Sequence, residues 1–184
     1  MDTKASIKVS NPIKGTPNSF ESKIQENIYN TLSNLNIDFE RVENEPAVTM
    51  EDCKAIDKAF GIETIKTILL TNRQKNKFYL LAMPAEKPFI TKDFGAALEI
   101  PRVSFADTEL LETMLGTPRG AATPLSILAD DNNAVSLIID AQLLTREKIV
   151  CTDATLHGFI SISVKDLIQK YLPLSNHIPK IINL

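Results

Sequence analysis

Two segments of this sequence carry residues whose types and spacing could do chemistry. The first is an apolar run at residues 65–71, which a single cation, Lys66, interrupts. The second is residues 116–128, GTPRGAATPLSIL, where glycines and prolines lie close together before an apolar run. A lysine on an apolar strand must snorkel, pair, or point into a polar cleft, where it could hold a phosphate or a developing oxyanion.

The second segment could bind a ligand through its main chain. The small side chains of Gly120, Ala121 and Ala122 would let a ligand approach the backbone, so that N–H and C=O groups do the recognising. A plainer interpretation is a tight turn that enters a strand, because small-residue turns before strands are common. For Lys66 the corresponding plain interpretation is a lysine on the solvated face of its strand.

The order and spacing of several short motifs resemble the YbaK/prolyl-tRNA synthetase-associated domain family. The resemblance is closest to its free-standing prolyl-tRNA editing branch, the ProX/PrdX-type deacylases, and it runs from about residue 20 to residue 172. The motifs are Lys66-Thr67, Arg102-Val103-Ser104-Phe105-Ala106, Leu115-Gly116-x-x-x-Gly120-x-x-Thr123-Pro124, Ile138-Ile139-Asp140 and Lys165-Asp166-Leu167.

The resemblance implies a trans-editing deacylase that hydrolyses the ester of mischarged tRNA(Pro), with alanyl-tRNA(Pro) favoured. It implies Lys66 and Gly120 as catalytic residues. It also implies the acceptor end of tRNA as partner, an association with prolyl-tRNA synthetase, and neither cofactor nor metal. The expected substrate-binding residues are Thr67, Ala121, Ala122, Thr123, Pro124, Thr152 and His157.

The chain departs from the family at positions that bear on the substrate. Many members have Asn after the lysine, where this chain has Thr67, and alanine editors carry His near the position of Thr152. His157 either compensates from a shifted loop or is unrelated to the chemistry. The amino acid removed therefore stays open between alanine, serine and cysteine. The missing histidine also favours an alternative, a non-catalytic binding module for an aminoacyl-nucleotide or a tRNA acceptor end.

Composition limits the other possibilities. With 184 residues and 43% hydrophobic residues, the chain is long enough for one domain with a substantial core. It has no apolar run of about 18 residues and no signal-peptide pattern, so we expect no membrane span and a cytoplasmic location. Cys53 and Cys151 stand far apart without the spacing of metal ligands, so we expect neither a zinc site nor a disulfide framework.

The charge balance argues against a protein that grips nucleic acid over a wide basic face. The formal net charge is −3 and the pI is about 5.5. A small enzyme that holds only an acceptor end needs few phosphate contacts, however. Arg73, Lys75 and Lys77 cluster in one turn, either as a solvated turn or as such contacts.

The pattern of elements predicts an α+β domain with a curved, mixed, mostly antiparallel sheet surrounded by helices. We expect a flexible leader at residues 1–17 and a single domain at 18–184, with Lys66 facing the loop at 120–124 across a cleft. Helices are expected from residue 18 and from 49, at 91–98 and 107–115, and from 164 to before Pro173. Strands are expected at 39–42, 65–71, 78–83, 103, 124–128, 135–140, 149–151 and 159–162.

Overall fold

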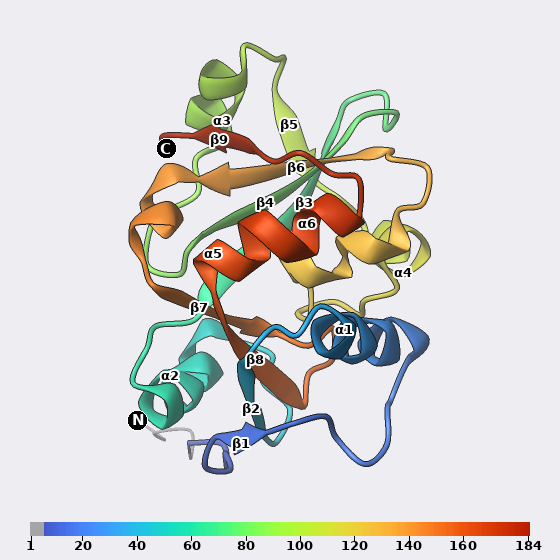
Figure 1. Cartoon of the computed structure of the whole chain (residues 1–184). Helices are drawn as coiled ribbons and strands as arrows, with labels where there is room; N and C mark the ends of the chain where they lie inside the picture. The colour runs from blue at the N-terminus through green and yellow to red at the C-terminus, as the bar shows by residue number, and fades with distance from the viewer. Residues whose placement is uncertain (1–5) are drawn as a thin grey trace.

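Two β-sheets and the helices around them make up the computed structural model, which describes residues 6–184 (Figure 1). The four-stranded sheet is antiparallel, in the order β1 (Ile13–Lys14), β2 (Phe39–Glu43), β8 (Gly158–Ser163) and β7 (Lys148–Thr152). The five-stranded sheet has the order β5 (Val103–Phe105), β3 (Ile65–Asn72), β4 (Phe78–Pro84), β6 (Val135–Asp140) and β9 (Lys180–Ile182). Its β4–β6 and β6–β9 pairs are parallel, and the β3–β4 and β3–β5 pairs are antiparallel.

The helices cover the sheets and fill the space between them (Figure 1). A continuous helical segment crosses the molecule between the two sheets and consists of α5 (Val164–Asp166), the π-helical turn η3 (Leu167–Tyr171) and α6 (Leu172–Leu174). The other helices are α1 (Lys23–Asn34), α2 (Met50–Phe60), α3 (Thr91–Leu98) and α4 (Thr108–Leu115), with 3₁₀ turns η1 (Pro124–Ala129) and η2 (Ala141–Thr145). Within residues 6–184 no helix is long and apolar enough to cross a bilayer.

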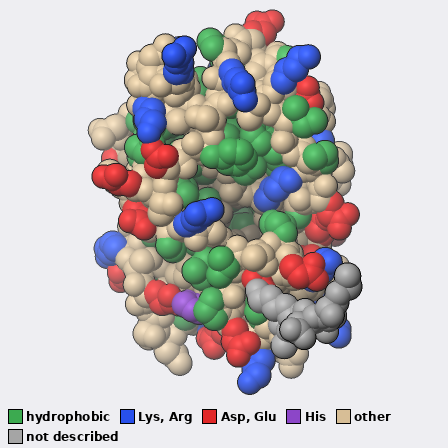
Figure 2. Space-filling model, turned by 180° about the vertical axis from the view of Figure 1, so that it is seen from behind, with side chains coloured by type: hydrophobic (Ala, Val, Ile, Leu, Met, Phe, Trp, Pro, Cys, Tyr) green, Lys and Arg blue, Asp and Glu red, His purple; other side chains and the backbone are tan. Residues whose placement is uncertain are grey.

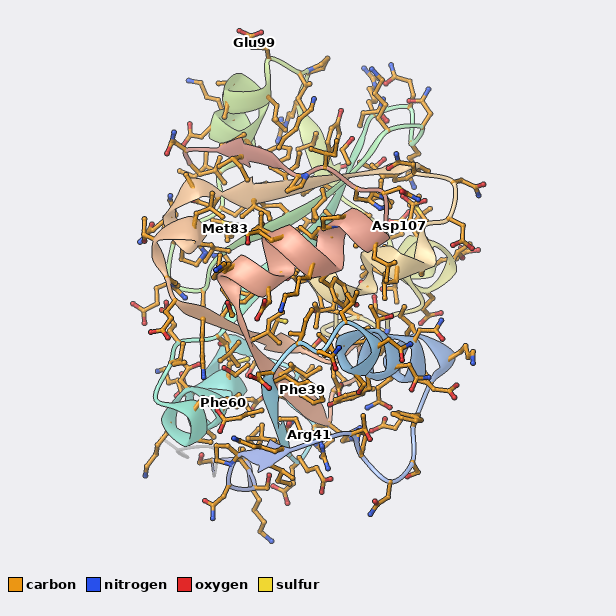
Figure 3. All side chains as sticks on the ribbon, viewed as in Figure 1. Phe39, Arg41, Phe60, Met83, Glu99 and Asp107 are labelled. Carbon is orange, nitrogen blue, oxygen red and sulfur yellow. The ribbon has the colours of Figure 1, made fainter. Side chains whose placement is uncertain are left out.

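The main core lies where the two sheets meet α1, η1 and the π-helical turn. It contains the fully buried Ile28, Leu32, Leu80, Leu125, Ile160 and Tyr171. A smaller core lies on the other face of the five-stranded sheet, around Met83 and Phe94. Side chains fill the layers throughout, with Met83 in the upper sheet and Phe39 in the lower one (Figure 3).

The expected α+β class with mostly antiparallel strands is confirmed, and several elements form for the reasons that the sequence indicates. Thr49 caps α2 and Asp52 closes the reciprocal capping box. The strands of the expected hairpin pair in register from Ile65 opposite Pro84 to Thr71 opposite Phe78. Helix α4 ends at Gly116, whose φ of 66° suits glycine.

The strand expected at residues 124–128 is wrong, because this segment forms the 3₁₀ turn η1. Thr123 caps it, accepting a hydrogen bond from the Leu125 N–H, and Pro124 occupies the first turn, where no N–H donor is needed. Leu125 and Ile127 are fully buried. A short apolar run looks the same to periodicity whether it is a buried strand or a buried turn.

The two ends of the chain differ from expectation as well. Helix α1 begins at Lys23 with Ser22 as its cap, rather than at residue 18. The Ser22 hydroxyl accepts a hydrogen bond from the Gln25 N–H, and the Gln25 side-chain oxygen accepts one from the Glu21 N–H. The last helix passes through Pro173 and is followed by β9. The π-helical turn ends at Tyr171, two residues before Pro173, which lacks the N–H for a regular i to i−4 hydrogen bond.

Part of the segment expected as a leader lies against the four-stranded sheet. Val9 bridges Asn44, and β1 pairs with β2 through Ile13 and Arg41. Backbone pairing of this kind needs no side-chain periodicity, so composition does not reveal it. Residues 1–5 lie outside the described residues.

A buried carboxylate, Asp153, ties α1 to the turn between β7 and β8. One oxygen of Asp153 accepts hydrogen bonds from Gln25 Nε2 at 2.8 Å and from the Tyr29 hydroxyl at 3.0 Å. The other accepts from the Thr155 hydroxyl at 2.7 Å and its N–H at 3.2 Å. Burial and the neighbouring carboxylate raise the pKa of Tyr29, so its hydroxyl stays a donor. Gly158 leaves room for this carboxylate, because a Cβ there would lie 2.1 Å from an Asp153 oxygen.

We therefore expect Gly158→Ala to lower the free energy of unfolding by roughly 2–4 kcal/mol, since the added methyl group must displace a buried, fully hydrogen-bonded carboxylate. Chemical denaturation monitored by circular dichroism measures the change. Gly95→Ala is the comparison, because its Cβ would lie 3.1 Å from the Ile100 carbonyl oxygen and would meet no charged group. Equal losses in the two variants would contradict this role for Asp153.

Candidate functional site

One face of the molecule is hollowed by a cleft of about 750 Å³. Figure 2 shows this face, with hydrophobic side chains in the hollow and Lys and Arg side chains at its border. The cleft lies between the first half of β3, the start of α2, the segment after β5 and the loop before η1. Of the residues predicted from sequence, it is lined by Lys66, Thr67, Gly120, Ala122 and Thr152.

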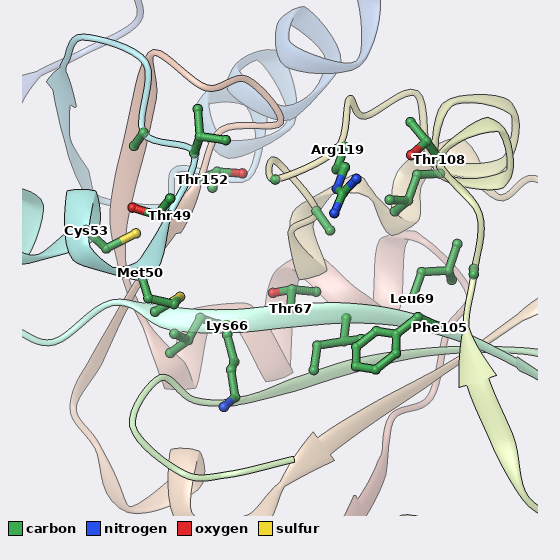
Figure 4. Close-up of a pocket in the computed structure, with 18 of the residues that line it drawn as sticks. Thr49, Met50, Cys53, Lys66, Thr67, Leu69, Phe105, Thr108, Arg119 and Thr152 are labelled. Carbon is green, nitrogen blue, oxygen red and sulfur yellow. The ribbon is translucent and has the colours of Figure 1, made fainter. Parts of the chain in front are cut away.

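Strand β3 sends Lys66 and Thr67 to opposite faces of the sheet, because successive side chains alternate along a strand. Thr67 shares its face with Ile65 and Leu69, which belong to the main core. The Lys66 ammonium lies on the other side and donates a hydrogen bond to the Lys87 carbonyl in the connection between β4 and α3. In Figure 4 the Thr67 side chain lies on the side of the cleft and the Lys66 side chain extends away from it.

The expectation that Lys66 faces the glycine loop therefore needs correction for its charged end. The Lys66 stem borders the cleft, but its ammonium is held by the Lys87 carbonyl. Burial lowers the pKa of Lys66, because the charged form loses hydration there. The side chain that points toward the loop is Thr67, and its hydroxyl oxygen is buried with no hydrogen-bond partner in the described structure.

The edge of β3 at the cleft is open. Strand β5 pairs only with Leu70, Thr71 and Asn72 within the described chain, and the Ala106 N–H then donates to the Leu69 carbonyl at 2.9 Å. N–H and C=O groups of alternate residues point to the same edge of an antiparallel strand. The main-chain groups of Thr67 therefore point the same way as those of Leu69, into the cleft. A ligand in the cleft can bind to this edge as well as to the Thr67 hydroxyl.

The opposite wall is the loop around Gly120, which has a φ of 91° that favours glycine. The Thr152 hydroxyl donates to the Ala121 carbonyl at 2.8 Å and accepts from the Ala154 N–H at 3.3 Å. Thr152 thus fixes the loop from behind. A hydroxyl with both roles engaged is a positioning group more than a free contact for a ligand.

Four of the expected substrate-binding residues lie outside the cleft lining. Ala121 and Thr123 are fully buried behind the loop, and Pro124 packs in the first turn of η1. His157 lies in a neighbouring polar pocket of about 390 Å³, where its Nδ1 is 3.0 Å from a Glu21 oxygen. Its main chain does take part in the fold, since the His157 carbonyl accepts from the Asn44 N–H.

Sequence reasoning missed several side chains of the cleft. Phe105 and Arg119 border it on opposite sides of β3, and Met50 lies at the end near α2 (Figure 4). Val48 also lines the cleft. Phe105 belongs to the motif at 102–106 and Arg119 to the loop motif, so both stood in segments already singled out. The sequence did contain a signal for both residues, because Phe105 is a large aromatic side chain and Arg119 a cation within motifs of mostly small or apolar residues.

The cysteines offer no thiolate nucleophile. Cys53 borders the cleft, and burial raises the pKa of its thiol to about 11. Cys151 is fully buried, and burial raises its pKa to about 12. Both groups are therefore thiols at neutral pH. Among residues 6–184 no group of three or more His, Cys, Asp or Glu side chains is arranged to hold a metal ion.

The chain is similar to proteins that are named for the editing of prolyl-tRNA. Prolyl-tRNA editing protein ProX of Acetoanaerobium sticklandii is 23% identical over 136 residues, which cover 74% of this chain and 83% of that protein. Prolyl-tRNA synthetase associated domain-containing protein 1 of Danio rerio is 24% identical over 155 residues, 83% of each protein. A solved structure described as a candidate trans-editing enzyme for prolyl-tRNA synthetase has the same fold, with a TM-score of 0.62 and 17% identity over 90% of this chain and 99% of its own.

The sequence model of the aminoacyl-tRNA editing domain matches residues 44–170. That range is more than half of the chain, and it includes β3, the Gly120 loop and Thr152. The chain therefore belongs to the aminoacyl-tRNA editing domain family, whose activity is the hydrolysis of aminoacyl-tRNA.

Proposed function

We propose that this protein is a trans-editing deacylase that hydrolyses the ester of mischarged tRNA(Pro), with alanyl-tRNA(Pro) as its preferred substrate. The observation that carries the proposal is the cleft, which Lys66, Thr67 and the Gly120 loop border in a chain of the editing family. The names of the ProX and associated-domain relatives support tRNA(Pro) as the tRNA.

Hydrolysis needs a water molecule that adds to the ester carbonyl and a ribose oxygen that leaves as the ester C–O bond breaks. The proton lost by the water ends on that ribose oxygen. No histidine lines the cleft in the described structure, so the neighbouring ribose hydroxyl of the substrate carries this proton in our proposal. The protein then contributes mainly position and electrostatic stabilisation.

Each wall of the cleft has a role in this scheme. The unpartnered Thr67 hydroxyl and the open edge of β3 bind the aminoacyl group. Main-chain groups at Gly120 and Ala122 orient the carbonyl and the water. The Lys66 ammonium exchanges the Lys87 carbonyl for a phosphate or for the developing negative charge, since a charged partner is the stronger acceptor.

Selection against prolyl-tRNA is by size. The Thr152 hydroxyl holds the Ala121 carbonyl, which fixes how closely the loop approaches β3. A difference of one methylene is worth about 1–3 kcal/mol, so rates on alanyl-, seryl- and cysteinyl-tRNA(Pro) should overlap. An association with prolyl-tRNA synthetase and a cytoplasmic location complete the proposal and stay predictions.

The competing function is a binding module without catalysis. Two observations favour it. His157 lies in a different pocket, and the Thr152 hydroxyl already donates one hydrogen bond and accepts another, so neither side chain is free to act as a general base. Incubating the purified chain with mischarged tRNA(Pro) species and measuring release of the amino acid separates the two functions. Release from at least one supports the deacylase, and tight binding without release supports the module.

Lys66→Ala should reduce the rate of deacylation by about 100-fold or more, which is the scale for losing one electrostatic stabiliser. Its thermal midpoint should change little, because only one hydrogen bond to Lys87 is lost. The matched control is Lys92→Ala, which removes an exposed lysine from α3. Full turnover by a folded Lys66→Ala protein would remove Lys66 from the mechanism.

The lowered pKa of Lys66 also predicts a pH dependence. The ammonium loses its proton at a lower pH than an ordinary lysine, so kcat/KM should fall as pH rises through that lowered pKa. Lys66→Arg keeps a charge above pH 12, and its alkaline fall should disappear. Rates are measured after subtracting spontaneous ester hydrolysis. Identical profiles for the two proteins would show that the charge of Lys66 is not used.

The role of Thr152 can be tested with three variants. Thr152→Ser keeps the hydroxyl and should retain most activity, whereas Thr152→Val keeps the shape and loses the hydrogen bond to the Ala121 carbonyl. We expect Thr152→Val to slow deacylation and to reduce the ratio of the rates on small aminoacyl groups to the rate on prolyl-tRNA(Pro). Thr152→Ala should have the same two effects more strongly. Relative rates on alanyl-, seryl- and prolyl-tRNA(Pro) give the result. Equal behaviour of the Ser and Val variants would contradict a positioning role.

A further inference from the structure

Phe105 exposes a large aromatic side chain at the end of the cleft that lies away from Thr152. It ends strand β5, borders the cleft and is 62% exposed. Its ring lies 5.7 Å from that of Phe89 in an edge-to-face arrangement, and Phe89 packs in the same way against the buried Phe94, at 5.8 Å. These edge-to-face contacts favour the observed orientation of the Phe105 ring. An ordered aromatic face open to a cleft is a stacking surface.

Arg119 supplies a charge opposite this surface. Its side chain borders the cleft from the loop wall, on the opposite side of β3 from Phe105 (Figure 4). Within residues 6–184 it makes no ion pair or hydrogen bond. The acidic side chain on the cleft lining is Asp107, and Lys75 neutralises it at 2.5 Å. The cleft therefore presents uncompensated positive charge beside an aromatic face, and that combination matches a nucleotide.

We propose that Phe105 and Arg119 form a nucleotide subsite that binds the 3′-terminal adenosine of the aminoacyl-tRNA. The adenine stacks on Phe105, and Arg119 pairs with the phosphate on the 5′ side of that nucleoside. This inference rests on the proposed function for the identity of its occupant. An ester held between Thr67 and Gly120 brings its ribose into the same cleft, so the base and the phosphate attached to that ribose must lie along the neighbouring walls.

The first experiment measures binding of adenosine monophosphate and of the trinucleotide CCA to the full chain by calorimetry. Base stacking on one aromatic side chain corresponds to roughly a 5- to 150-fold change in affinity, and Phe105→Leu should weaken CCA binding by that factor. Phe105→Leu keeps the apolar contact with Phe89, and Phe105→Tyr keeps the aromatic face and should bind as the original protein does. The control is Ile178→Ala, which removes a 91% exposed apolar side chain outside the cleft lining.

The second experiment tests Arg119 through salt dependence. Loss of one phosphate contact should lower the slope of log affinity against log salt concentration by about 0.7–1. Arg119→Ala should show that change with CCA, and Arg119→Lys should restore the slope. An unchanged slope in Arg119→Ala would remove the phosphate contact from the proposal.

Deacylation assays separate this inference from the proposed function. With alanyl-tRNA(Pro), Phe105→Leu should raise KM and leave kcat within about 3-fold, because stacking supports binding more than chemistry. Turnover by the original protein together with an unchanged KM in Phe105→Leu would overturn the subsite and leave the deacylase standing. Absence of turnover together with CCA binding that Phe105→Leu weakens would overturn the deacylase and support the subsite. Binding of both adenosine monophosphate and CCA that Phe105→Leu leaves unchanged would overturn the terminal adenosine as occupant.

Discussion

Asp153 is a carboxylate that folding removes almost completely from water, and four hydrogen-bond donors replace the hydration that it loses. Two of these donors come from Gln25 and Tyr29 on α1, near the start of the described chain, and two from Thr155 in the β7–β8 turn. The carboxylate therefore fixes a helix against a turn that is distant in sequence. Apolar packing alone would hold the two together without setting their register.

The position of one wall of the cleft depends on this hydrogen-bond network. Thr152 precedes Asp153 and donates its hydroxyl to the Ala121 carbonyl, so the turn that Asp153 fixes also holds the loop on the far wall. The near wall is β3, held in the other sheet by its pairing with β4. The width of the cleft is thus set by two separately anchored elements, and Gly120 provides the backbone conformation that lets the loop turn between them.

Local signals in the sequence predicted what local interactions decide. The capping box at Thr49 and Asp52 and the hairpin between β3 and β4 need only neighbouring residues, and both form as expected. The face toward which Lys66 points was not predictable, because an open strand edge and the position of the Lys87 carbonyl are tertiary facts. The 3₁₀ turn at Pro124 was not predictable for a similar reason. The rest of the core buries this segment, and a buried turn has the same short apolar run as a buried strand.

The pairing of β2 with β8 has a consequence for how this chain folds. Phe39 lies opposite Ile162 and Glu43 opposite Gly158, so the centre of the four-stranded sheet joins residues from nearly opposite ends of the sequence. Closing so long a loop costs entropy before the paired strands return any stabilisation, and folds dominated by such contacts form in milliseconds to seconds rather than microseconds. Until that closure, β8 and the neighbouring strand β7, which carries Thr152, lack their partner β2 in the four-stranded sheet.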